Sequence, residues 1–464
     1  MTAAATSTRE ALDRVRAADA ERRARRAERH GLRDGLRELM RAMGGFEDHG
    51  LLGCGLVPCA GGGVQLRLSN GVAGFAGLST CGSQACPVCA SKIAAKRAEE
   101  VRQVLTWARA ERMTLAMVTL TVRHQASDPL AAVWDAVAAG WAEVTSGSKW
   151  ASETPQAYAD RLADWRARGA AADAREINPS TGKVQRAPKG WRHGIEPQRR
   201  IGEAEAAGVE GWVKAVEVTH GQAGWHVHVH AVLLLDYRQD ETAAHAHVRA
   251  RILGESMHAR WAKGVARVGF ESWRDHGGLD VTVSDRAEKR LADYLTKAAD
   301  EPAKVRASVA KKGASLAMEA TLGGMKAARS EKGRTPFQIA ADAVADLPEL
   351  EGAGVLSPDI DLWDEYVRGS YGRRLISWSS GLRDRANLDG EQTDEQIAAE
   401  EVGTADDAVA TFDSGTWWSL VRRGRELLDV TETQGRAGAY AWLDRHGYAY
   451  TVPEEDPHRP PPRE

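Results

Sequence analysis

The central third of the chain carries the alternating apolar and polar residues that are typical of β-strands. Valine, leucine and threonine dominate these segments, and glycine or polar residues bound them. The segments cover residues 113–124, 211–220, 224–235 and 277–283. We therefore expect four strands here, the third of which reads GWHVHVHAVLLL.

A second pattern, with apolar residues three and four positions apart, predicts helices between and after these strands. Helices are expected over residues 130–145, 243–266 and 284–300, the last with Ser284 or Asp285 as its N-cap. Strands and helices alternate without the short, regular rhythm of a parallel βαβ sheet. The pattern predicts an α+β fold in which helices flank a central antiparallel sheet.

The composition of the remaining sequence changes at several points, and these changes indicate where one structural unit ends and the next begins. Residues 1–45 alternate arginine with acidic residues and are expected to form a solvated helix. No lysine or arginine lies between Arg385 and Arg422, where acidic residues gather, so a mobile acidic linker is predicted. The expected units are a charged helical arm (1–45), a cysteine-rich module (46–110), a strand-rich domain (111–300) with an insertion (151–200), a helical extension (301–385), the linker (386–414) and a small helical unit with a tail (415–464).

Composition and charge exclude several classes of protein. The net charge of −3 is too small to predict overall nucleic-acid affinity, so such affinity must come from local patches. No apolar run approaches the roughly 18 residues needed to span a bilayer, and the charged N-terminus lacks the apolar core of a signal peptide. We expect a soluble, cytoplasmic protein with no membrane partner.

The histidines of the third strand are the strongest candidates for chemistry. Because side chains alternate across a strand, His226, His228 and His230 share one face and the intervening valines share the other. Neighbouring histidines lie about 7 Å apart along the strand, which two imidazoles can close on one ion. The outer pair, about 13 Å apart, is too distant for all three to bind one metal comfortably. The third ligand is either Glu217, on the preceding strand, or His226, and two imidazoles with one carboxylate suit Mg²⁺ or Mn²⁺.

The five cysteines all lie between residues 54 and 89, which favours a metal site in a reducing compartment over a disulfide framework. Cys86 and Cys89 form a C-x₂-C pair. Cys81, with either Cys54 or Cys59, can complete four thiolates, a set that suits structural Zn²⁺.

Tyr294 is the candidate nucleophile on the helix expected after the histidine strand. Leu291 and Leu295 follow the spacing of a buried stripe with Tyr294 at its edge, so periodicity alone favours a core tyrosine. Arg290 and Lys297 flank the tyrosine at i−4 and i+3, however. These cations suit a phosphodiester and favour the phenolate.

The histidine strand matches two kinds of protein, the histidine-triad nucleotide hydrolases and the HUH endonucleases, and Tyr294 favours the second. Taken together, the chain resembles the rolling-circle replication initiators (Rep) of actinobacterial plasmids, which are HUH endonucleases. Six ordered segments carry the resemblance: FAGLSTCGSQACPVCASKIAAKR (75–97), MVTLTVRH (117–124), VEVTHGQAGWHVHVHAVLL (216–234), LADYLTK (291–297), GRTPFQIA (333–340) and LWDEYVRGSYGRRLISWSSGLR (362–383).

The resemblance implies that His228 and His230 are the metal-binding pair on a middle strand of the sheet, with His226 preceding them. Tyr294 would nick one strand of single-stranded or cruciform origin DNA and keep a 5′-phosphotyrosyl link, while a host helicase and DNA polymerase extend the free 3′ end. The histidines precede the tyrosine, which favours replication over conjugative mobilisation. Related initiators often carry a carboxylate one turn before the tyrosine, where this chain has Arg290.

The resemblance also assigns the zinc ligands to Cys54, Cys81, Cys86 and Cys89, with Cys59 as the extra cysteine. Lys92, Lys96 and Arg97 follow on an expected helix and are candidate contacts to the DNA backbone. Two rivals to the initiator are a histidine-triad hydrolase, with no role for Tyr294, and a non-catalytic DNA-binding regulator.

Overall fold

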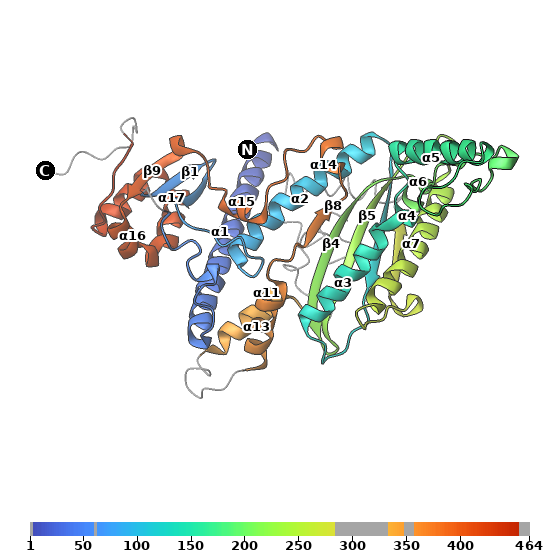
Figure 1. The fold of residues 1–464 in the computed structure, drawn as a ribbon. Helices are drawn as coiled ribbons and strands as arrows, with labels where there is room; N and C mark the ends of the chain where they lie inside the picture. The colour runs from blue at the N-terminus through green and yellow to red at the C-terminus, as the bar shows by residue number, and fades with distance from the viewer. Residues whose placement is uncertain (1–2, 60–62, 284–332, 348–356, 454–464) are drawn as a thin grey trace.

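The computed structural model describes residues 3–59, 63–283, 333–347 and 357–453. Its main sheet is antiparallel, with the strand order β6-β3-β5-β4-β7 and with β8 also paired to β4. The strands are β3 (Thr114–Thr121), β4 (Val209–Gly221), β5 (Gly224–Leu235), β6 (Leu279–Val283), β7 (Gly333–Arg334) and β8 (Ile376–Trp378). The predicted mixture of helices and antiparallel strands is therefore confirmed, and the histidine strand β5 lies between β3 and β4 (Figure 1).

The hairpin of β4 and β5 sets the register of the candidate site. Gln222 and Ala223 form its turn between the paired residues Gly221 and Gly224. Gly224 has a φ of +87°, and a Cβ there would lie 2.9 Å from the carbonyl oxygen of Gln125, so glycine is needed. The short turn makes Glu217 the cross-strand partner of His228.

One face of the sheet is apolar and is covered by two helices, α3 (Leu130–Thr145) and α7 (Ala243–Ala266), which have the predicted bounds. Val227 and Val229 on this face are fully buried. The two helices pack so closely at Gly140 that a Cβ there would lie 2.6 Å from the ring of Trp261. This layer explains why valines alternate with the histidines.

The other face is divided into an apolar half and a polar half. Helix α2 (Pro87–Ala110) shares a buried cluster with the apolar half, in which Val232 and Leu234 are fully buried. Beyond Ala231, β5 is thus covered on both faces and its sequence becomes continuously apolar. The histidines occupy the polar half.

A second, three-stranded sheet joins distant parts of the chain and corrects the predicted linker. Its order is β2-β1-β9, with β1 (Val64–Ser69), β2 (Val72–Ala76) and β9 (Ala408–Phe412). The residues predicted as a mobile acidic linker include β9 and the helix α15 (Asp394–Ala399), so that prediction is wrong. Pairing of β9 with β1 buries Val409 and Ala410 in a core shared with α16 (Ser414–Leu420) and α17 (Gly424–Arg445), so the expected cysteine-rich module and C-terminal unit share this core.

The N-terminal helix α1 (Ala3–Met43) packs against the rest of the protein, contrary to the predicted solvated arm. Leu36, Leu39 and Met40 are buried, so its C-terminal part is no solvated arm. Further up, Arg22 and Arg26 form ion pairs with the fully buried side chain of Glu432 on α17. The apolar stripe of α1 is confined to its last turns, because charged residues interrupt it earlier in the helix. The burial of α1 was therefore hard to predict from the sequence.

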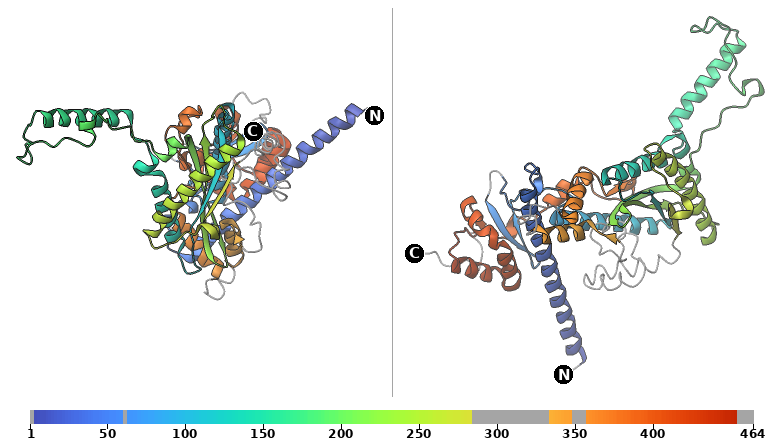
Figure 2. Two further views of the ribbon diagram at one scale, coloured as in Figure 1. Left: turned by 90° about the vertical axis from the view of Figure 1, so that its right-hand side faces the viewer. Right: turned by 90° about the horizontal axis from the view of Figure 1, so that it is seen from below.

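Six further α-helices belong to the described fold. They are α4 (Gly147–Trp150), α5 (Pro155–Asp173), α6 (Glu203–Ala206), α11 (Pro336–Ala345), α13 (Pro358–Ser370) and α14 (Leu382–Arg385). Helix α5 and the segment after it extend away from the body of the molecule (Figure 2). No helix in the described ranges is both long and apolar enough to cross a lipid bilayer.

Candidate metal centre and nucleophile

Glu217, His228 and His230 converge on the polar half of the sheet. The two Nε2 atoms of His228 and His230 are 2.9 Å apart. The Glu217 carboxylate oxygen Oε2 lies 3.2 Å from the first and 3.1 Å from the second. Two residues from one strand and one from its hairpin partner thus present three ligand atoms to a single point.

This donor set fits a divalent cation. Ligand atoms about 2.1 Å from one ion and at right angles to each other lie about 3 Å apart, as these three do. Nitrogen and carboxylate oxygen together suit Mn²⁺ or Mg²⁺ with coordination positions left for a phosphate. The three residues can therefore hold a metal ion. His230 is buried, whereas Glu217 and His228 are only partly buried and leave access for a substrate.

Thr119 on β3 orients His230 from the other side. Its hydroxyl lies 3.1 Å from Nδ1 of His230, the nitrogen that does not face the cluster. If Nδ1 carries the proton and donates to Thr119, the lone pair of Nε2 points at the metal position. Sequence reasoning missed this residue, although the MTLAMVTLTVRH strand was recognised, because only the register of β3 on β5 places Thr119 opposite His230.

Replacing Thr119 by valine is expected to weaken Mn²⁺ binding about 10- to 100-fold, because the imidazole loses the partner that fixes its tautomer. Isothermal titration with Mn²⁺ measures this change. Thr121→Val is the matched control, since Thr121 lies on the same strand opposite His228 and is expected to leave the affinity unchanged. Equal losses in both variants would contradict a specific role for Thr119.

His226 stands apart from the three converging residues. Its Nδ1 lies 3.0 Å from Nε2 of His124, whose own Nδ1 lies 2.8 Å from the carbonyl oxygen of Ala223 and so donates to it. Burial, together with the neighbouring His228 and His124, lowers the pKa of His226 to about 4. Of the two candidates for third ligand, the structure brings Glu217 to the cluster and pairs His226 with His124.

The candidate nucleophile Tyr294 and its flanking residues Arg290 and Lys297 lie outside the described residues. Their roles stay predictions from the sequence.

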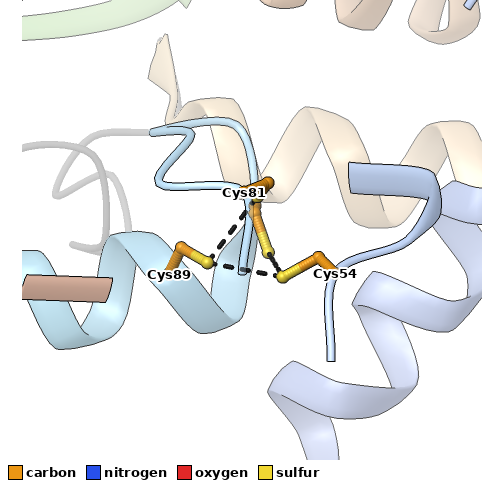
Figure 3. A group of neighbouring side chains, drawn as sticks. Cys54, Cys81 and Cys89 are labelled. Atoms are coloured by element: carbon orange, nitrogen blue, oxygen red, sulfur yellow. Dashed lines mark hydrogen bonds between the residues drawn. The ribbon is translucent and has the colours of Figure 1, made fainter. Parts of the chain in front are cut away.

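Four cysteines, Cys54, Cys81, Cys86 and Cys89, form a second cluster at the start of α2. Figure 3 labels three of them, Cys54, Cys81 and Cys89. The sulfur of Cys54 lies 3.8 Å from that of Cys86 and 3.4 Å from that of Cys89, and the sulfurs of Cys81 and Cys89 are 3.6 Å apart. Hydrogen bonds from the other three thiols, Cys81 first, lower the pKa of Cys54. This set of thiols can hold a zinc ion. Cys59 is exposed and lies outside the cluster.

Two of the three α2 cations that were predicted to contact DNA form bonds within the protein. Arg97 is buried and forms ion pairs with Glu100 at 2.9 Å and Asp394 at 3.1 Å, which corrects its expected role as a DNA contact. Lys92 donates to the carbonyl oxygens of Ala398 and Glu400. The α15 segment therefore binds the side chains of Arg97 and Lys92. The expected DNA contact of Lys96 remains a prediction.

Comparison with known proteins gives two relatives. The chain is 29% identical to "Protein rep" of Streptomyces lividans over 405 residues, which cover 82% of this chain and 80% of that protein. It is 27% identical over 321 residues to "Neomycin resistance protein" of Streptomyces cyanogenus, covering 65% and 67% of the two chains. No protein-family model and no solved structure matches.

Proposed function

We propose that this chain is a plasmid replication initiator that nicks one strand of its origin DNA through a tyrosine nucleophile. One observation carries the proposal: Glu217, His228 and His230 converge on paired strands and fit a divalent cation. Similarity to a Streptomyces protein named Rep over most of both chains supports the replication role.

Each residue has a distinct task in the proposed reaction. A bound Mn²⁺ or Mg²⁺ would polarise a phosphate oxygen and stabilise the charge that develops there. The Tyr294 oxygen forms a bond to phosphorus as the bond from phosphorus to the 3′ oxygen breaks. The phenol loses its proton, the 3′ oxygen gains one, and a 5′-phosphotyrosyl link remains. Lys297 and Arg290 favour the phenolate and contact the phosphate.

The products of this step suit replication. The free 3′-hydroxyl primes a DNA polymerase, and a helicase of the host separates the strands. Because a phosphodiester is exchanged for a phosphotyrosyl ester, rejoining the DNA needs no ATP. The cysteine cluster, with Zn²⁺ bound, would stabilise the start of α2.

Incubation of the protein and Tyr294→Phe with single-stranded plasmid-origin DNA and Mn²⁺ tests the proposal. On a denaturing gel we expect a protein–DNA adduct that requires metal and is absent from Tyr294→Phe. Tyr158→Phe is the matched control, because Tyr158 lies on α5, and it is expected to form the adduct normally.

Other results would point elsewhere. Cleavage without an adduct would make the metal centre part of a hydrolytic nuclease and remove Tyr294 from the mechanism. If no origin sequence in a panel is cut, the proposal fails, and metal-independent turnover of a small nucleotide would then indicate the histidine-triad hydrolase.

A further inference from the structure

The insertion between α4 and α6 forms a basic arm, defined here as residues 153–202. Helix α5 and the returning segment run side by side away from the sheet domain, as both views of Figure 2 show. The arm takes no part in the metal centre or in the cysteine cluster. Its shape and composition therefore need a separate explanation.

Glu153 fastens the two ends of the arm together. Its carboxylate, with 5% of the side chain exposed, accepts hydrogen bonds from Arg161 at 2.7 and 2.6 Å and from Arg200 at 3.2 Å. Arg199 donates to the backbone carbonyl of Glu153. The outgoing and returning segments are thus joined where they leave the body.

Two tryptophans support the arm further out. The rings of Trp165 and Trp191 lie 4.8 Å apart in an edge-to-face arrangement. The indole N–H of Trp165 donates to the carbonyl oxygen of Lys189, and that of Trp191 donates to Asp173. Gly169 allows this contact, since a Cβ there would lie 2.1 Å from the Trp191 ring. The returning segment is therefore held against α5.

The tip of the arm, residues 174–193, concentrates positive charge. It contains five lysines and arginines and one acidic residue, Glu176, which gives a net charge of +4 in a chain whose net charge is −3. The five cations are Arg175, Lys183, Arg186, Lys189 and Arg192, all exposed. None of the five belongs to an ion pair between described residues, whereas the α5 cations Arg161, Arg166 and Arg168 are each paired with a carboxylate.

We infer that the tip of the arm binds the phosphate backbone of duplex DNA beside the nicked strand. Unpaired, exposed cations on a projecting element neutralise phosphates and release counterions. Single-strand binding by stacking needs an exposed aromatic ring, but the one Trp, Tyr or Phe of the tip, Trp191, is packed on Trp165. The contact is therefore to the backbone and independent of sequence. The inference rests on the proposed function for its biological setting only.

Binding to a mixed-sequence duplex, measured without added Mn²⁺ or Mg²⁺, tests the inference separately from catalysis. We compare the protein with Arg186→Gln/Lys189→Gln/Arg192→Gln over a series of salt concentrations. Each lost phosphate contact lowers the slope of log K against log salt by about 0.9, so the triple variant is expected to lose about 2.7 from the slope and to bind more weakly. The control replaces three exposed cations elsewhere, Arg251, Arg422 and Arg445, by glutamine and is expected to bind as the parent does.

The outcomes separate the two proposals. An unchanged slope and affinity in the arm variant would overturn the inference, and so would an equal loss in the control variant. Loss of binding in the arm variant alone supports it, whether or not the protein cuts DNA. Direct binding of polyglutamate together with no duplex binding would mark the arm as a site for acidic protein and overturn the DNA assignment.

Discussion

The His228→Ala variant is expected to lose Mn²⁺ binding by at least about 100-fold, and origin nicking with it. His228 contributes one of three ligand atoms, and its Nε2 lies within 3.2 Å of both of the others. Changes in the outer partners of a metal site already cost about 10- to 100-fold in affinity, so removal of a direct ligand costs at least as much. Titration calorimetry with Mn²⁺ measures the affinity without relying on activity.

His226→Ala is the matched control for this experiment. It removes an imidazole from the same face of the same strand, but that imidazole is hydrogen-bonded to His124 and lies outside the ligand cluster. We expect the control to keep its Mn²⁺ affinity. A loss as large as that of His228→Ala would show that His226 is a ligand and that the pairing with His124 does not hold in the metal-bound protein.

The Cys86→Ser variant is expected to show the largest loss of stability. Cys86 is fully buried, it immediately precedes α2, and its thiol belongs to a cluster of four. Structural zinc contributes on the order of 10 kcal/mol to the folding of small zinc domains, so loss of one ligand should remove several kcal/mol here. We expect less than one zinc per chain and a clearly lower Tm, measured by elemental analysis and calorimetry.

Cys59→Ser provides the corresponding control, because Cys59 is exposed and lies outside the cluster. It is expected to retain the zinc content and Tm of the parent. Unchanged metal content in Cys86→Ser would refute the zinc site, and equal losses in both variants would show that the ligand set includes Cys59.

Much of the local structure followed from the sequence. The helices at residues 130–145 and 243–266 and the strand at 224–235 have the predicted bounds, because their apolar patterns are long and regular. The prediction of a mobile linker in the acidic stretch was wrong, because it rested on composition and not on a long, regular apolar pattern. Composition reports how strongly a segment is solvated on average, whereas β9 is a short strand that becomes stable only by pairing with β1, more than 300 residues away.

For the candidate site, the sequence by itself determined which side chains share a face, since alternation along a strand is a local property. It therefore placed His226, His228 and His230 together, and it also grouped the cysteines. Only the tertiary structure decided which of these residues work together. The register of β3 on β5 sets Thr119 against His230, the loop after β3 brings His124 to His226, and α15 pairs with Arg97. These choices depend on contacts between residues far apart in the chain, which no local pattern encodes.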